Sequence, residues 1–154
     1  MKKTISIGIQ GFSDLREQDC FFVDKTNFIK EWWANRDVVT LITRPRRFGK
    51  TLNMSMLECF FSKKYANRAD LFEGLSIWQD ETYRKLQGAY PVIFLSFAAV
   101  KAGNLEDAKT QIKQEIARLY RGNRYLMRED VFSENERELY DGTIVNMDDV
   151  MAQD

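Results

Sequence analysis

The sequence predicts an α/β fold in which helices flank a parallel sheet, and three observations lead to this prediction. Residues 38–43 form a continuous run rich in β-branched side chains, which suits a strand buried on both faces. Residues 91–97 form a second apolar run of strand length. A helix is predicted between them, from Lys50 to about residue 64. This order of strand, helix and strand is typical of a parallel sheet.

The elements before residue 38 are predicted as an arm, a loop and a helix. Isoleucines alternate with polar or small residues in residues 5–9, which indicates a short strand or extended arm. Residues 11–19 indicate a polar loop. Asp24 is placed to cap a helix that extends to about residue 34. The apolar face of this helix would carry Phe28, Ile29, Trp32 and Trp33.

The elements after the first strand are mainly helical. Short helices are predicted near residues 71–72 and 83–86, and Asn104 is placed to cap a long helix to about residue 120. Ser133 and Glu136 have the spacing of a capping box for one more helix. We therefore divide the chain into a lead-in arm and helix (1–37), a strand–loop–helix–strand–helix core (38–122) and a helical tail (123–154).

The composition excludes several classes of function. The 154 residues carry 23 basic and 23 acidic side chains, whereas a dedicated nucleic-acid binder has an excess of positive charge. The chain has no histidine, which excludes Ser-His and Cys-His catalysis and histidine metal sites. Two cysteines make no disulfide framework, and no apolar run approaches the ~20 residues of a membrane span. We expect a cytoplasmic protein without a membrane partner.

The segment that joins the first strand to the next helix carries the chemistry. It ends in Gly49-Lys50-Thr51, the end of the phosphate-binding pattern G-x-x-x-x-G-K-[ST]. Gly49 would permit the backbone conformation, Lys50 would reach the β and γ phosphates, and Thr51 would offer its hydroxyl to Mg²⁺. The first glycine of the pattern is replaced by Arg44. The context nevertheless predicts a P-loop NTPase-like sheet that binds ATP with Mg²⁺.

Three stretches of the chain, residues 22–26, 41–57 and 90–97, resemble the AAA-ATPase-like family of bacterial proteins. That family characteristically has Arg-Pro-Arg-Arg-Phe-Gly-Lys in its loop, which is the sequence of residues 44–50 here. The resemblance implies ATP binding as part of a larger ATPase, often joined to a restriction-endonuclease-like domain. The nucleotide-binding residues that it implies are Arg44, Arg46, Arg47, Phe48, Gly49, Lys50, Thr51 and Leu52, with Thr51 on Mg²⁺.

A catalytic acid is the missing part of the pattern. ATP hydrolysis needs an aspartate after an apolar strand to hold Mg²⁺, and in the family this strand lies farther downstream than residue 154. The local candidate is the run 144–149, in which Asn146 interrupts the apolar residues, and we favour a helix start there. We therefore expect a chain truncated before its acidic (Walker B) strand, with no catalytic residue of its own.

Several alternatives stay open at this point. Arg44, Arg46 and Arg47 fit phosphate contacts and surface ion pairs equally well. Residues 24–26 fit a helix cap better than part of a nucleotide pocket, and the two tryptophans fit core packing better than a partner surface. The alternative function is a non-catalytic module whose basic loop binds a protein or nucleic acid. Open sheet edges at residues 38–43 and 92–97 would favour a homodimer or completion by a C-terminal portion.

Overall fold

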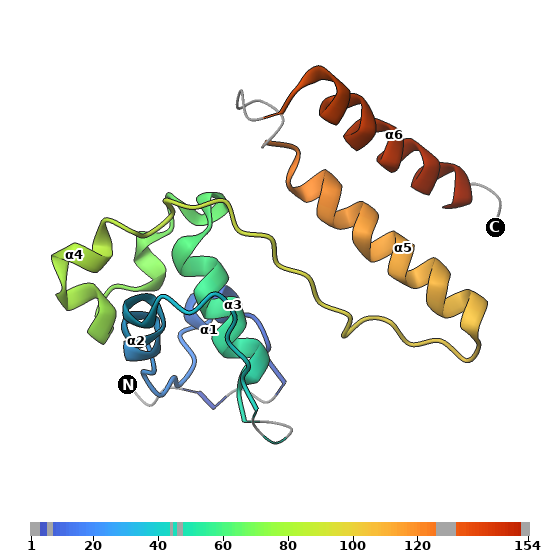
Figure 1. Ribbon diagram of the computed structural model, residues 1–154. Helices are drawn as coiled ribbons and strands as arrows, with labels where there is room; N and C mark the ends of the chain where they lie inside the picture. Colours follow the sequence, from blue (N-terminus) through green and yellow to red (C-terminus); the bar gives the residue numbers. More distant parts are fainter. Residues whose placement is uncertain (1–3, 6–7, 44, 46–47, 126–131, 152–154) are drawn as a thin grey trace. The chain divides into compact units, whose positions relative to one another are not determined.

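The protein is described by a computed structural model that covers residues 4–5, 8–43, 45, 48–125 and 132–151. The chain divides into two compact units, Met1–Val92 and Ile93–Asp154. Both units are built from helices and irregular segments, which Figure 1 shows in the colours of the sequence. No helix in the described ranges is long and apolar enough to cross a membrane.

The first unit is organised around one central helix, α3. Its helices are α1 (Phe12–Glu17), α2 (Asn27–Asn35), α3 (Lys50–Phe61), the 3₁₀ helices η1 (Lys63–Tyr65), η2 (Ala69–Leu71) and η3 (Ser76–Gln79), and α4 (Glu81–Arg84). Helix α1 packs on α3, and the buried backbone N–H of Phe12 donates to Ser55 Oγ at 3.0 Å. The C-terminal half of α3 is buried in the unit, whereas Thr51 and Met54 near its start are exposed. Figure 1 shows α3 beside α1.

Aromatic side chains dominate the core of this unit. Phe72 stacks on Phe12 with ring centroids 5.1 Å apart and meets Phe60 edge-on at 5.0 Å. Trp33 stacks on Phe61 at 5.2 Å, which confirms that the two tryptophan positions pack against the core. The buried apolar cluster contains Phe12, Ile29, Met56, Cys59, Phe60, Phe61, Leu71, Phe72, Leu75 and Ile77. These residues come from α1, α2, α3, the 3₁₀ helices η2 and η3 and the segment between those two helices, so the core ties these parts together.

Backbone hydrogen bonds fix the C-terminal end of α3. The carbonyls of Phe60 and Phe61 accept from the N–H groups of Gly88 and Tyr90, at 2.8 and 2.9 Å. The N–H of Lys63 in turn donates to the carbonyl of Tyr90 at 2.8 Å. The last carbonyls of a helix have no intrahelical partner, and the chain near residue 90 supplies partners here. The opposite end of α3 starts at Lys50 and directly follows the loop.

A carboxylate joins the start of α2 to η3. Asp24 Oδ1 accepts from the N–H and the hydroxyl of Thr26, at 2.9 and 2.7 Å. Its Oδ2 accepts from the N–H and the hydroxyl of Ser76, at 2.7 and 2.6 Å. The fully buried Thr26 also accepts from the N–H of Ile77 through its Oγ1. We name Asp24, Thr26 and Ser76 the carboxylate clamp.

The second unit contains a pair of long helices, α5 (Leu105–Gly122) and α6 (Glu134–Met151), which pack on each other. Asn104 caps α5 by accepting from the N–H of Asp107 at 2.9 Å, as the sequence predicts. The capping box before α6 is also confirmed, because Ser133 N–H donates to Glu136 Oε2 at 2.8 Å. Tyr120 and Tyr140 stand with ring centroids 4.7 Å apart and join the two helices.

The predicted parallel sheet is wrong. The described residues contain no β-strand, and their bridges are the isolated pairs Thr4–Cys20 and Ser62–Tyr90. Residues 38–43 and 91–97 lack helical structure and make no ladder. Val38 and Leu41 are 100% and 83% exposed, and Ile93 is 64% exposed. A run of β-branched residues predicts an extended backbone, but a sheet also requires a neighbour for its N–H and C=O groups. The expected dimer or completion by a C-terminal portion stays a prediction.

The polar loop predicted for residues 11–19 is also wrong, because most of it forms α1. Phe12 and Leu15 are both buried and lie three residues apart, on one face of the helix. A six-residue helix is too short to be stable by itself, so its packing on α3 sustains it. The prediction that Asp24 caps α2 needs a smaller correction. The residue at the cap position of α2 is Thr26, and Asp24 accepts a hydrogen bond from the N–H of Thr26 instead of capping the helix itself.

The carboxylate clamp predicts acid-sensitive stability. Partial burial raises the pKa of Asp24, but the hydrogen bonds from Ser76 and Thr26 outweigh this effect and lower the pKa to about 2. A depressed pKa adds stability above the unfolded-state value, and this stability is lost as the pH falls through the folded-state value. Because Asp24 is exposed and solvent screens part of this effect, Asp24→Ala should lower the free energy of unfolding at pH 7 by about 1 kcal/mol. The variant should also lose less stability than the wild type as the pH falls from about 4 to about 2.

Urea unfolding followed by circular dichroism at several pH values measures both effects. Asp37→Ala is the matched control, because Asp37 is exposed and lies outside the clamp. If the free energy of unfolding declines below pH 4 as steeply in Asp24→Ala as in the wild type, the clamp is not the cause of the acid sensitivity.

Candidate functional site

The N-terminal end of α3 has the backbone form of an anion-binding site. Gly49 precedes the helix with φ of 73° and ψ of 18°, a left-handed conformation that glycine adopts most readily. A Cβ at Gly49 would meet nothing within 4 Å, so the backbone angle, and not crowding, favours glycine. Intrahelical bonding starts with the N–H of Asn53, which donates to the carbonyl of Gly49 at 2.9 Å. The preceding amides, from Gly49 to Leu52, are those that a helix leaves without intrahelical acceptors.

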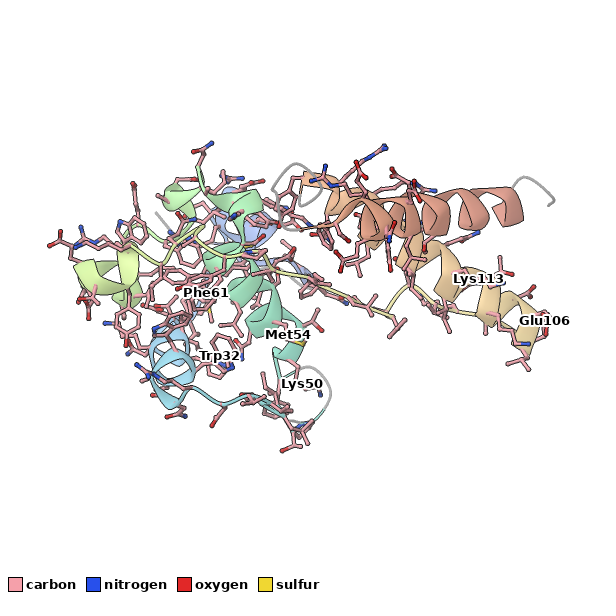
Figure 2. All side chains as sticks on the ribbon, turned by 45° about the horizontal axis from the view of Figure 1, so that its top comes forward. Trp32, Lys50, Met54, Phe61, Glu106 and Lys113 are labelled. Atoms are coloured by element: carbon pink, nitrogen blue, oxygen red, sulfur yellow. The ribbon has the colours of Figure 1, made fainter. Side chains whose placement is uncertain are left out.

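Lys50 and Thr51 bring a cation and a hydroxyl to the same helix end. The Lys50 ammonium lies beside the loop and donates to the carbonyl of Pro45 at 3.1 Å. Figure 2 shows Lys50 at the start of α3, with Phe61 at the end that enters the core. The hydroxyl-bearing Thr51 follows in the first turn and is exposed. The Leu52 side chain, in contrast, is half-buried and packs against the core, so the nucleotide contact predicted for this residue would use its backbone N–H.

A cavity of about 330 Å³ adjoins this helix end. It is lined by Lys25, Phe28, Ile42, Phe48 and Asn53. Phe48 belongs to the set of nucleotide-binding residues predicted from the sequence, and Lys25 belongs to residues 24–26, for which a place in a nucleotide pocket is the less favoured interpretation. Asn53 lies three residues after Lys50, which puts the two side chains on neighbouring positions of one helix surface. That spacing could have identified Asn53 in advance, but no sequence signal placed Ile42 beside the start of α2.

The loop arginines lie outside the described part of the chain. The structure describes Pro45 and Phe48 but not residues 44, 46 and 47. The roles predicted for Arg44, Arg46 and Arg47 therefore stay predictions. Phe48 is 62% exposed at one edge of the cavity.

The residues at the helix end fit Mg²⁺ as part of a nucleotide complex. Magnesium keeps several waters and is held by one or two protein groups together with substrate phosphates. In the described residues no group of three or more acidic or cysteine side chains could hold a metal alone. The run 144–149 lies inside α6, so it does not form the strand that a catalytic acid would follow. A bound Mg²⁺ would neutralise charge on the phosphates. Thr51, which the sequence assigns to Mg²⁺, is exposed in the first turn of α3, and its contact with the metal stays a prediction.

Comparisons with known proteins agree with the resemblance noted in the sequence. A family model described as a predicted AAA-ATPase matches residues 6–151. An uncharacterised protein of the vnfD 5′ region of Azotobacter chroococcum mcd 1 is 30% identical over 114 residues, which is 73% of this chain. The match spans 20% of that relative's length. No solved structure matches the chain significantly. Because the family model covers nearly the whole sequence, the chain belongs to the predicted AAA-ATPase family.

Proposed function

We propose that this protein binds a nucleoside triphosphate with Mg²⁺ through the loop and first turn of α3, as part of a larger AAA-type ATPase. The observation that carries the proposal is the arrangement at Gly49, Lys50 and Thr51. Amides without intrahelical acceptors, a lysine ammonium and a hydroxyl occur within three consecutive residues at the positive end of a helix dipole. Membership of the predicted AAA-ATPase family supports the same ligand.

Each residue has a distinct role in this proposal. Gly49 lets the backbone approach the phosphates, and the amides up to Leu52 donate to their oxygens. Lys50 exchanges its exposed hydrogen bond to Pro45 for a stronger, charge-assisted bond to the β and γ phosphates. Thr51 contacts Mg²⁺. We also propose that Arg44, Arg46 and Arg47 donate to phosphate oxygens, since arginine forks match phosphate geometry.

The first prediction from this proposal concerns affinity. Lys50→Ala removes one charge-assisted contact, and we expect Mg²⁺-ATP affinity to fall by about 10- to 100-fold. Isothermal titration calorimetry on the full chain measures the change. Lys113→Ala is the matched control, because Lys113 is an exposed lysine on α5, outside the candidate site.

The alternative function, a module whose basic loop binds a protein or nucleic acid, gives a different result. It requires no nucleotide affinity that depends on Lys50. If Mg²⁺-ATP does not bind, or binds equally well to Lys50→Ala, the proposed function is wrong.

The second prediction concerns turnover. Hydrolysis requires an acidic residue that holds Mg²⁺ and a group that positions water. The best candidate run for such an acid, residues 144–149, forms part of α6. We therefore expect this chain to bind Mg²⁺-ATP without appreciable hydrolysis, as measured by phosphate release. Steady turnover that Lys50→Ala abolishes would contradict this prediction, and loss of that turnover in Asp148→Ala would identify the acid.

A further inference from the structure

The cavity next to the loop is lined by three apolar and two polar side chains. Phe28 and Ile42 are half-buried, and Phe48 contributes a second aromatic ring at 62% exposure. The half-buried Asn53 supplies a carboxamide, and the exposed Lys25 supplies an ammonium. Neither polar side chain hydrogen-bonds to another residue in the described ranges. The volume of about 330 Å³ is at the lower end of the range of small-molecule sites.

Two residues that line the cavity are sequence neighbours of the proposed phosphate site. Phe48 directly precedes Gly49, and Asn53 lies one turn into the helix that begins at Lys50. A ligand with its phosphates at the amides of Gly49 to Leu52 would therefore have its remaining part close to Phe48 and Asn53.

Hydrogen bonds attach two of the segments that line the cavity to the rest of the unit. The carboxylate clamp fixes the start of α2, and Lys25 stands between two of its members, Asp24 and Thr26. The N–H of Phe28 donates to the carbonyl of Lys25 at 2.9 Å, which sets Phe28 in the first turn of α2. Farther along α2, Trp32 Nε1 donates to Thr40 Oγ1 at 3.1 Å and attaches the segment that contains Ile42. Such preorganisation reduces the entropy lost on binding.

We propose that this cavity binds the base of the nucleotide and that Asn53 selects adenine. The inference rests on the proposed function, since it assigns the other half of the same ligand. Aromatic and aliphatic walls suit a flat heterocycle, because every base has a face that stacks on an aromatic ring. Lys25 lies at the exposed edge of the cavity, where it suits the ribose or phosphate oxygens rather than the enclosed base.

The carboxamide of Asn53 gives the base selectivity. An asparagine side chain presents an NH₂ donor group beside a carbonyl acceptor, which matches N7 and the N6 amino group of adenine. Guanine presents two acceptors, O6 and N7, on the corresponding edge. A guanine would therefore direct an acceptor at the carbonyl oxygen of Asn53.

The test compares three ligands, Mg²⁺-ATP, Mg²⁺-GTP and Mg²⁺-tripolyphosphate, by calorimetry on the full chain. Tripolyphosphate has no base, so the ratio of ATP to tripolyphosphate affinity isolates the contribution of the cavity. In Phe28→Ala we expect this ratio to fall by about 5- to 100-fold through lost stacking. In Asn53→Leu, which keeps a similar side-chain volume, we expect the preference for ATP over GTP to fall by about 10-fold. Tripolyphosphate affinity should stay within about twofold in both variants.

Phe21→Ala is the matched control, because Phe21 is an aromatic residue that is 54% exposed and lies outside the cavity wall. Phe28 packs against the core, so Phe28→Ala is tested only after its melting temperature shows that it is folded. If it is unfolded, the decision rests on Asn53→Leu alone.

The outcomes separate this inference from the function on which it rests. An ATP-to-tripolyphosphate ratio unchanged by Phe28→Ala, or an ATP preference unchanged by Asn53→Leu, would overturn the base site while leaving phosphate binding intact. Stronger binding of GTP than of ATP by the wild type would overturn the selection of adenine. Failure of the wild type to bind any of the three ligands would overturn the proposed function and the base site together.

Discussion

The edge-on contact between Phe60 and Phe72, at 5.0 Å between ring centroids, holds the C-terminal half of α3 in the core. Phe72 also stacks on Phe12, so α1 and the 3₁₀ region close around the same ring. Aromatic pairs of this kind contribute about 0.5–1.5 kcal/mol each beyond their buried area. Because one end of α3 is fixed in this way, its other end is a rigid platform for the loop. Preorganised donors on a rigid helix bind an anion with a smaller loss of conformational entropy than flexible donors would.

Two kinds of contact then complete the site around this platform. The carboxylate clamp fixes the start of α2 through Asp24, and the bond between Trp32 and Thr40 attaches the segment before the loop. Neither contact involves a residue that would touch phosphate. Both lie next to residues of the cavity, because the clamp precedes Phe28 at the start of α2 and Thr40 precedes Ile42 by two residues. The loop motif would thus bind the phosphates of the proposed nucleotide, and the clamp lies beside the cavity proposed for its base.

The sequence predicted the local features of this chain better than its architecture. The caps at Asn104 and Ser133, the start of α3 at Lys50 and the family could be read from short patterns, because each depends on neighbouring residues. The absence of a sheet among the described residues could not be read from short patterns. The composition of residues 38–43 favours an extended backbone, but these residues have no strand to pair with. The cavity was missed for a related reason. Its walls come from three separate segments, and the clamp between Asp24 and Ser76 spans 52 residues.

The central claim is that the amides at the start of α3 bind triphosphate, and amide NMR spectra of the ¹⁵N-labelled chain test it most directly. A titration with Mg²⁺-ATP should give the largest chemical-shift changes at the N–H groups of Gly49, Lys50, Thr51 and Leu52. These groups exchange water for charged phosphate acceptors, whereas the amides of α5 should remain unchanged. Shifts centred on any other part of the chain, or no shifts at millimolar nucleotide, would contradict the account.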